Sequence, residues 1–349
     1  MFNKKQFGAK MNEELAAKYA RSPQWNGKKF ENLVETKMGL NWQNIPELLY
    51  KQFFAKKGRE PKAPLPVEPF DKAAFLSEST ATKFIWYGHA VVLLRMANKT
   101  ILIDPMLGPN ASPIAPFETK RFSENTLSLI DAFPEIDIVL MTHDHYDHLD
   151  LVSIEALQGK VQQFIVALGV GRHLEKWGIA PQKITEMDWW DTVNINNLEI
   201  SFTPTRHFSG RGLRDREHCL WGGWVLKTED ENIYFSGDGG YGQHFKEVGE
   251  RLGPFDFGFM ECGQYNKNWR PIHLFPTESV QAARDAQVAR IMPFHWAGFA
   301  LAQHTWKGPA EDFVKAATAE HIPYITPKIG QLVDLGQLPT NEHWWENME

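Results

Sequence analysis

Residues 137–148 read DIVLMTHDHYDH and join a short apolar run to a cluster of potential metal ligands. The run DIVLM (137–141) is apolar from its second residue onward, which is typical of a buried strand. In the extended chain that follows, alternate side chains point the same way, so His143 and His145 can converge on one ion. The segment therefore predicts a metal site at the end of a strand.

Two more potential ligands follow within the same segment. The chain is expected to turn into a helix near residue 149, which would aim Asp147 and His148 at a second point. Imidazole and carboxylate are ligands that zinc prefers. A solvated polar loop is the alternative, but burying so many ligands beside a buried strand is costly unless a metal offsets their desolvation.

The spacing H-x-H-x-D-H after a strand resembles the signature of the metallo-β-lactamase superfamily. The resemblance implies three further ligands in order along the chain, and the sequence offers His207, Asp238 and His295, each after an expected strand. Alone, each has an ordinary explanation, as a histidine in the core or on the surface or an aspartate in a glycine-rich turn. Their order and their places at strand ends favour the metal site.

By this resemblance the ligands form two metal sites. The first site would take His143, His145 and His207. The second site would take Asp147, His148 and His295, and Asp238 would bridge the two. Two divalent ions, zinc first and manganese or iron as alternatives, would share and activate one water for attack. Asp147 and Asp238 thereby count as catalytic residues too. Because neither Cys219 nor Cys262 stands at a ligand position, a centre of nitrogen and oxygen ligands is expected.

Two residues are expected to support the ligands rather than bind metal. Asp104 ends the expected strand 100–104, where the superfamily commonly carries an aspartate, and it could accept the second N–H of a ligand histidine. A turn-forming aspartate before Pro105 is the alternative. His89, in the Gly-His pair at 88–89, is expected to be structural or to lie behind the ligands.

Within the superfamily, several segments look closer to N-acyl-phosphatidylethanolamine phospholipase D than to β-lactamases. These segments are LWGGW (220–224), GPFD (253–256), PTESV (276–280) and FHWAGFAL (294–301). The match implies that His273 is a catalytic histidine that binds no metal and assists at a phosphoryl or leaving-group oxygen. A histidine of a surface loop is the alternative. Tyr241 and Gln264 are further candidates for lining the pocket.

The resulting functional prediction is a metal-dependent hydrolase that cleaves a phosphodiester of a small or lipid-like molecule. The 13 Trp residues, several of them in 177–190 and 221–224, favour a bulky apolar substrate. A sugar-phosphate lactonase of the same fold is the alternative enzyme. A non-catalytic metal-binding or scaffold protein is the alternative of another class, which the intact ligand set disfavours. The formal net charge of −6 argues against a nucleic-acid partner, including for a nuclease of the same fold.

The chain of 349 residues, 43% of them hydrophobic, is long enough for a sizeable core and too apolar to be disordered. Expected strands cover 84–96, 100–104, 137–141, 163–168, 198–203, 220–228, 232–235, 255–260, 290–293 and 324–325. Expected helices cover 149–157, 171–177, 242–252, 277–287 and 309–319. Strands that first pair consecutively and then alternate with helices indicate an α/β (α+β) fold, a four-layer αββα metallo-β-lactamase sandwich.

Residues 1–70 differ from the rest of the chain. They are rich in Lys, Asn and Gln and end in a Pro-rich stretch, which predicts an N-terminal arm or linker, with the hydrolase domain over 71–349. Within the arm, IPELLYKQFF (45–54) has one apolar helical face, which could pack on the body or make peripheral contact with a membrane. The sequence lacks a transmembrane run and a signal-like start, which favours a cytoplasmic protein, or a periplasmic or membrane-associated one if a leader was removed.

Overall fold

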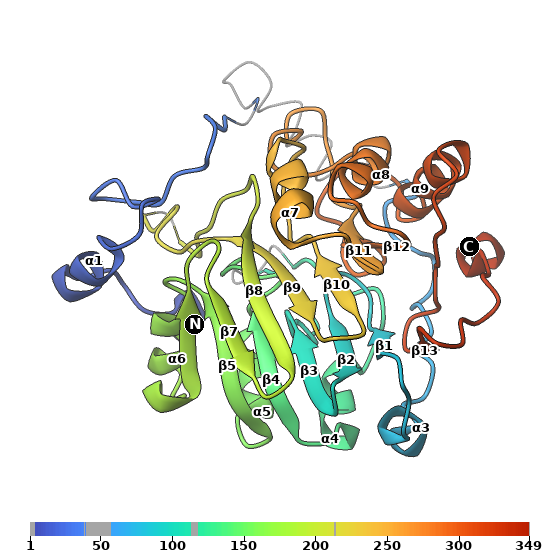
Figure 1. The fold of residues 1–349 in the computed structure, drawn as a ribbon, viewed down its shortest axis with the longest axis horizontal. Helices are drawn as coiled ribbons and strands as arrows, with labels where there is room; N and C mark the ends of the chain where they lie inside the picture. Colours follow the sequence, from blue (N-terminus) through green and yellow to red (C-terminus); the bar gives the residue numbers. More distant parts are fainter. Residues whose placement is uncertain (1–3, 38, 40–56, 113–117, 213, 349) are drawn as a thin grey trace.

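Two β-sheets form the centre of the molecule (Figure 1). The structure, a computed structural model, describes residues 4–37, 39, 57–112, 118–212 and 214–348. The first sheet has seven strands in the order β13-β1-β2-β3-β4-β5-β6. Its strands are β1 (Lys83–Trp86), β2 (Val92–Met96), β3 (Lys99–Ile103), β4 (Ile136–Met141), β5 (Val161–Ala167), β6 (Ile184–Met187) and β13 (Leu332–Asp334). Strands β3 to β6 run parallel, and β13, β1, β2 and β3 pair antiparallel.

The second sheet has six strands in the order β12-β11-β10-β9-β8-β7. Its strands are β7 (Thr192–Ile195), β8 (Leu198–Pro204), β9 (Gly222–Lys227), β10 (Asn232–Phe235), β11 (Phe257–Glu261) and β12 (Ile291–Phe294). Strands β10, β11 and β12 are parallel to one another, whereas β7 to β10 pair antiparallel.

Helices cover the outer faces of the two sheets, which confirms the predicted αββα sandwich (Figure 1). On the seven-stranded sheet they are α4 (Leu129–Ala132), α5 (Leu151–Leu157) and α6 (Gly171–Lys176). On the six-stranded sheet they are α7 (His244–Leu252), α8 (Pro276–Asp285) and α9 (Gly308–Ala319). The short helices α1 (Glu13–Tyr19) and α3 (Lys72–Leu76) precede the first strand.

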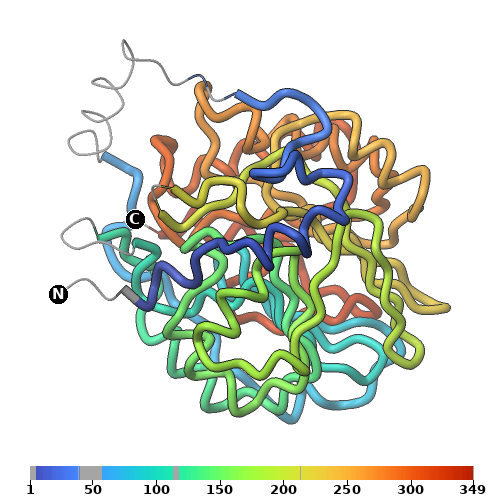
Figure 2. The backbone as a smooth tube through the Cα atoms, turned by 90° about the vertical axis from the view of Figure 1, so that its left-hand side faces the viewer, coloured from blue at the N-terminus to red at the C-terminus, as the bar shows by residue number. Residues whose placement is uncertain are grey.

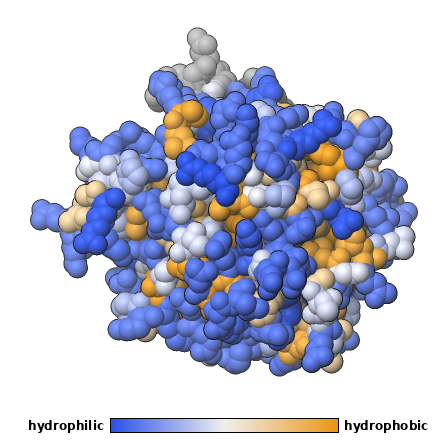
Figure 3. All heavy atoms as spheres, in the orientation of Figure 1, coloured by the Kyte–Doolittle hydropathy of each residue, from blue (hydrophilic) through white to orange (hydrophobic). Residues whose placement is uncertain are grey.

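Aromatic side chains pack between the two sheets and hold them together. The ring of Phe84 on β1 lies 5.5 Å from that of Phe257 and 4.9 Å from that of Phe259, both on β11. All three are fully buried or nearly so. Burying a phenylalanine side chain stabilises a fold by about 1.5–3 kcal/mol, so such contacts hold the strand ends in fixed relative positions. The apolar residues are mostly inside, and the face seen in Figure 3 is largely hydrophilic with separate apolar groups.

The strand predicted over 84–96 is wrong as a single element. The chain reverses at Gly88 and His89, whose φ angles are 79° and 55°, and the two halves pair antiparallel as β1 and β2. Glycine adopts a left-handed φ at no steric cost, so it allows a reversal that the apolar run around it does not reveal. The strand predicted over 324–325 is reduced to an isolated bridge between Tyr324 and Ile291. The short strands β6, β7 and β13 were not predicted, because their side chains are partly exposed and their patterns are weak.

The N-terminal arm packs along the outside of the body (Figure 2). Tyr19, Trp25 and Phe30 form an aromatic cluster with ring centroids 5.0–5.6 Å apart, and Tyr19 and Phe30 are fully buried. The arm is thus anchored by side-chain packing. The amphipathic segment 45–54 lies outside the described residues. Among the residues that are described, no helix combines the length and apolar character needed to cross a membrane.

Candidate metal centre

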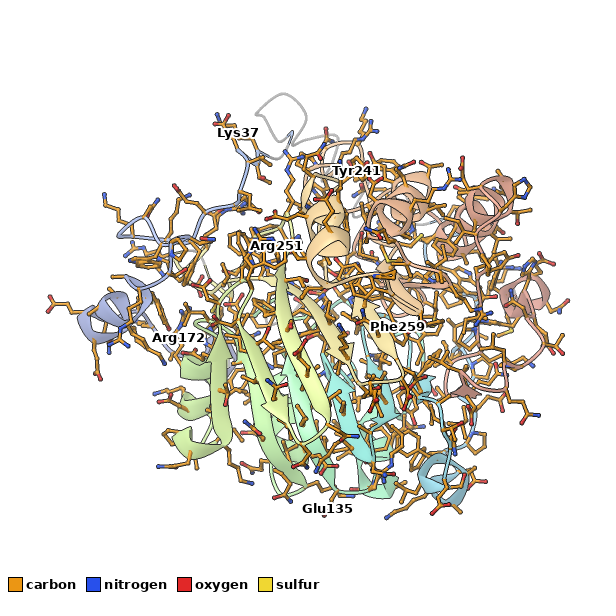
Figure 4. All side chains as sticks on the ribbon, in the orientation of Figure 1. Lys37, Glu135, Arg172, Tyr241, Arg251 and Phe259 are labelled. Atoms are coloured by element: carbon orange, nitrogen blue, oxygen red, sulfur yellow. The ribbon has the colours of Figure 1, made fainter. Side chains whose placement is uncertain are left out.

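The candidate ligands lie on loops that leave the carboxyl ends of strands. His143, His145, Asp147 and His148 follow β4, His207 follows β8, Asp238 follows β10 and His295 follows β12. In Figure 4, Glu135 precedes β4 at the lower edge of the sandwich, whereas Tyr241, three residues after Asp238, lies near the upper edge. Loops at the carboxyl ends of strands meet at one edge, and this is where open α/β sheets bind ligands.

Three histidines make the first group of ligands. Nε2 of His143 lies 2.9 Å from Nδ1 of His145, and Nε2 of His207 lies 3.2 Å from that same Nδ1. His143 and His207 are almost fully buried. The three nitrogens are close enough together to share one ion.

The second group joins Asp147, His148 and His295. Oδ2 of Asp147 lies 3.6 Å from Nε2 of His148 and 3.4 Å from Nε2 of His295. Oδ2 of Asp238 is 3.1 Å from each of these imidazole nitrogens and 4.0 Å from Nε2 of His207. Asp238 therefore lies between the two groups, and the structure brings all seven predicted ligands together.

Asp104 and Thr142 orient two of the histidines. Oδ2 of Asp104 lies 2.7 Å from Nδ1 of His148, so Nδ1–H donates to the carboxylate and Nε2 faces the centre. The Thr142 hydroxyl donates to Asp104 and can then accept from Nδ1–H of His143, 2.9 Å away. These hydrogen bonds assign the tautomers, and they match the supporting role predicted for Asp104.

His89 supports the ligands from behind. Its Nε2 lies 2.9 Å from Oδ2 of Asp147, and the side chain is fully buried. His89, Asp104 and His295 all have left-handed backbones, with φ angles of 55°, 42° and 70°. Such conformations cost about 1–3 kcal/mol each and concentrate at functional sites, where the surrounding structure enforces them.

Glu261 is a residue of the centre that the sequence analysis missed. It ends β11 with a fully buried carboxylate. Oε1 lies 3.1 Å from Nδ1 of His273 and 3.3 Å from Nδ1 of His295, and Oε2 accepts from the N–H of Leu274 at 2.7 Å. The available signal was a single acid that closes the apolar run FGFM at a strand end.

His273 lies beside both groups of ligands. Its ring stacks on that of His295 at 5.4 Å between centroids and lies 5.2 Å from that of His207. Trp269 is next to it, at 6.3 Å. His273 is also near enough to His207 and Asp238 for their ligand atoms to form one cluster. A group in this position can reach a substrate held at the centre.

The two groups of ligands differ in electrostatics. Burial, followed by repulsion from neighbouring histidines, lowers the pKa of His143 well below its usual value, and burial lowers the pKa of His145 to about 4. Burial also lowers the pKa of His148 and His295 by itself, but the carboxylates around them outweigh it. The pKa of His148 is raised well above its usual value, and that of His295 is raised to about 10.

The donor set fits a metal. Nδ1–H of His207 donates to the carbonyl of Ile272 at 2.9 Å, so Nε2 carries a lone pair that points at Nδ1 of His145. Nε2 of His143 likewise carries a lone pair toward the same atom. Among the described residues, the buried Oδ1 of Asp238 has no hydrogen-bond partner. Converging lone pairs and a buried unpaired oxygen are costly without a cation to bind them.

Other predicted residues lie elsewhere. Tyr241 donates its hydroxyl hydrogen to Asp285 on α8. The Gln264 amide is buried and accepts from the N–H groups of Leu301 and Ala302, so it holds the loop after His295 rather than lining a pocket. Five of the tryptophans that were expected to favour a bulky apolar substrate fill the core instead and are at most 5% exposed: Trp177, Trp189, Trp221, Trp224 and Trp296.

A further buried cluster of potential ligands joins Asp144, His173 and Cys219. Nδ1 of His173 accepts from the N–H of Ala9 at 3.0 Å, so the ring proton is on Nε2, which faces Asp144 at 3.3 Å. No imidazole lone pair is therefore turned toward the cluster. It is a hydrogen-bonded connection between the metal-binding loop, α6 and the N-terminal arm.

Comparisons with known proteins show which family and which relatives the chain resembles. The Beta-lactamase superfamily domain matches residues 99–296, a range that contains all seven candidate ligands. Rv0906 of Mycobacterium tuberculosis, a protein of uncharacterised function, is 33% identical over 330 residues, which cover 93% of this chain and 88% of that protein. N-acyl-phosphatidylethanolamine-hydrolyzing phospholipase D 1 of Caenorhabditis elegans is 30% identical over 301 residues, with 80% and 83% covered.

The fold also matches that of Igni18, a metallo hydrolase of Ignicoccus hospitalis. The TM-score is 0.55 at 19% identity, and the match covers 73% of this chain and 98% of Igni18. At this identity the similarity concerns the fold alone, because one fold can carry many chemistries.

Proposed function

The chain belongs to the β-lactamase superfamily, in the branch of the N-acyl-phosphatidylethanolamine-hydrolysing phospholipases D, and from this premise we propose that it hydrolyses the phosphodiester bond of a lipid-like substrate. As a member of this superfamily it is a metal-dependent hydrolase. The observation that carries the finer proposal is the position of His273, which lies against both groups of ligands while Glu261 holds its Nδ1.

The proposed centre holds two divalent cations, with zinc first. One would be held by His143, His145 and His207. The other would be held by Asp147, His148 and His295, with Asp238 between the two. Imidazole nitrogens and carboxylate oxygens in this number suit zinc, and the same donors suit manganese or iron. When bound, such a pair of cations lowers the pKa of a water toward neutrality and polarises a phosphoryl oxygen.

The residues of the chain have separate roles in this proposal. His89 and Asp104 hold Asp147 and His148 in place through the hydrogen bonds described above. Glu261 engages Nδ1–H of His273 and leaves Nε2 available; as an imidazolium, His273 would donate its Nε2–H to a phosphoryl oxygen or to the leaving oxygen. His273 is therefore the proposed catalytic residue outside the ligand set.

A hydrolysis panel on the zinc-loaded protein tests the proposal. We expect cleavage of bis-p-nitrophenyl phosphate and of N-acyl-phosphatidylethanolamine in detergent micelles, with two equivalents of metal bound. The His143→Ala protein should lose both metal and cleavage. Cleavage of a sugar-phosphate lactone without any phosphodiester cleavage would replace the proposal with the lactonase alternative. Two bound metals without turnover on any substrate would favour a non-catalytic role.

A further inference from the structure

We propose that the N-terminal arm supports the metal centre, and that Asn32 is the residue through which the arm positions His207. The inference rests on the metal-binding role proposed above for His207. It assigns to the arm a function in the metal centre, whereas the sequence predicted a linker that could pack on the body or contact a membrane.

The Asn32 amide clamps the backbone of His207 from both sides. Its Oδ1 accepts from the N–H of His207 at 3.1 Å, and its Nδ2 donates to the carbonyl of His207 at 2.7 Å. Oδ1 also accepts from Nε1 of the buried Trp221 at 3.2 Å, which holds the amide in this orientation. One side chain of the arm thereby supports both polar backbone groups of a proposed ligand.

This support matters because His207 lies beyond the sheet. Strand β8 ends at Pro204, and β9 begins only at Gly222. The described residues between them contain no helix or strand. The ladder that holds β8 therefore does not extend to His207, and its backbone must be held by side chains. Within the side chain, Nδ1 is engaged by the Ile272 carbonyl, so a backbone shift would turn Nε2 away from His145.

The arm is itself firmly attached around this point. The N–H of Phe30 donates to the carbonyl of Glu217 at 2.8 Å, and the Phe30 ring is fully buried. Arg206 donates to the hydroxyl of Thr36 and to the carbonyl of Glu35, at 3.0 and 3.1 Å. The arm thus lies across the loop that carries His207 over residues 30–36, and in Figure 2 it runs along the outside of the body.

The arm also contacts the loop that carries His273. The N–H of Gly39 donates to the carbonyl of Asn268 at 2.8 Å, next to Trp269. The arm therefore contacts both the loop of a proposed ligand and the loop of the proposed catalytic histidine. A segment that only covered the surface would not need hydrogen bonds to both loops.

The test compares two asparagines of the arm. Asn32→Ala removes the clamp. Asn26→Ala is the matched control, because the Asn26 side chain also accepts two hydrogen bonds, from the N–H groups of Lys28 and Lys29, and donates one to Glu31, all within the arm. Apoproteins would be titrated with Co²⁺ and with Zn²⁺, and the cobalt absorption bands would report the ligand set. Circular dichroism would verify folding.

We expect Asn32→Ala to weaken the binding of one equivalent of metal by about 10–100-fold, the usual effect of removing a group that orients a ligand. The cobalt spectrum should change, and Asn26→Ala should behave as the wild type. In the His207→Ala background, Asn32→Ala should have no further effect on metal binding. If Asn32→Ala does not fold, Asn32→Asp keeps the two acceptor contacts but sets a carboxylate oxygen against the carbonyl oxygen of His207, and this repulsion should weaken the binding of the same equivalent.

Equal metal affinity and equal cobalt spectra for Asn32→Ala and Asn26→Ala would overturn the inference while leaving the proposed function intact. An additional loss of affinity from Asn32→Ala in the His207→Ala background would overturn it too, because the effect would then not act through His207. If the wild-type protein bound no metal at all, the proposed function would fail first, and this inference with it.

Discussion

The buried carboxylate of Glu261 lies 3.1 Å from Nδ1 of His273. The same oxygen lies 3.3 Å from Nδ1 of His295. One carboxylate therefore accepts a hydrogen bond from the proposed catalytic histidine and lies beside the ring of a proposed metal ligand, and the two rings stack on each other. Glu261 thereby positions the His273 ring from the end of β11, next to His295.

Glu261→Gln should lower kcat by about 10–100-fold on bis-p-nitrophenyl phosphate and leave KM and the two equivalents of metal nearly unchanged. A glutamine presents one NH₂ group in place of an oxygen, so it must lose either the hydrogen bond from Leu274 N–H or the one from His273. Glu186→Gln is the control, since Glu186 accepts from the N–H groups of Gly169 and Gly171 away from the centre. Equal kcat values for the two variants would contradict the role of Glu261.

His273→Ala should retain both metals and lose kcat by about 10²–10⁴-fold, the usual range for an acid–base or hydrogen-bonding group. The structure gives the reason, because the imidazole lies next to both groups of ligands and its Nδ1 is engaged by Glu261. Metal analysis and turnover of one preparation measure both effects. Loss of a metal equivalent would instead place His273 among the ligands.

Gly263→Ala should misplace His295 and lower the metal content. A Cβ at this position would lie 1.9 Å from the carbonyl oxygen of His295, so the backbone of the ligand would have to move. Overpacking of this kind costs about 1–3 kcal/mol. Gly159→Ala is the control, since a Cβ there meets nothing within 4 Å. Urea unfolding and metal analysis of both variants make the comparison, and an intact Gly263→Ala centre would show that the loop can yield.

The stability of the protein should fall on acidification because of His173. Burial lowers the pKa of this fully buried histidine to about 4, whereas the unfolded chain has the ordinary value of about 6.5. Between about pH 6.5 and pH 4, His173 is therefore protonated in the unfolded chain but not in the folded protein. The stabilisation is thus complete above about pH 6.5 and is lost as the pH falls toward 4, by up to about 3 kcal/mol.

Urea unfolding of the wild type and of His173→Gln, at pH 7.5 and at pH 4, measures this effect. The variant should be less stable at pH 7.5 but should lose less stability on acidification, because its side chain does not titrate. The metal ligands titrate in both proteins and cancel in the comparison. An identical loss in the two proteins would show that His173 does not control the acid sensitivity.

The tertiary structure corrected the sequence analysis where composition could not distinguish a pocket from a core. The indoles of Trp221 and Trp224 fill the interior. An aromatic residue has the same pattern in either place, because both environments exclude water. The reversal at Gly88 and His89 escaped prediction for a related reason, since the residues on both sides of it, 84–87 and 90–94, are all apolar.

By itself the sequence determined which residues are the candidate ligands of the proposed metal centre. His143, His145, Asp147 and His148 are neighbours in the chain, so local backbone geometry alone makes them converge, and His207, Asp238 and His295 stand at strand ends. Only the tertiary structure decided which groups support the centre. Glu261 reaches His295 because β11 and β12 pair in parallel, and Asn32 reaches His207 because Tyr19 and Phe30 bury the arm against the body. Both contacts join residues far apart in the chain, and no local periodicity encodes them, because long-range packing brings them together.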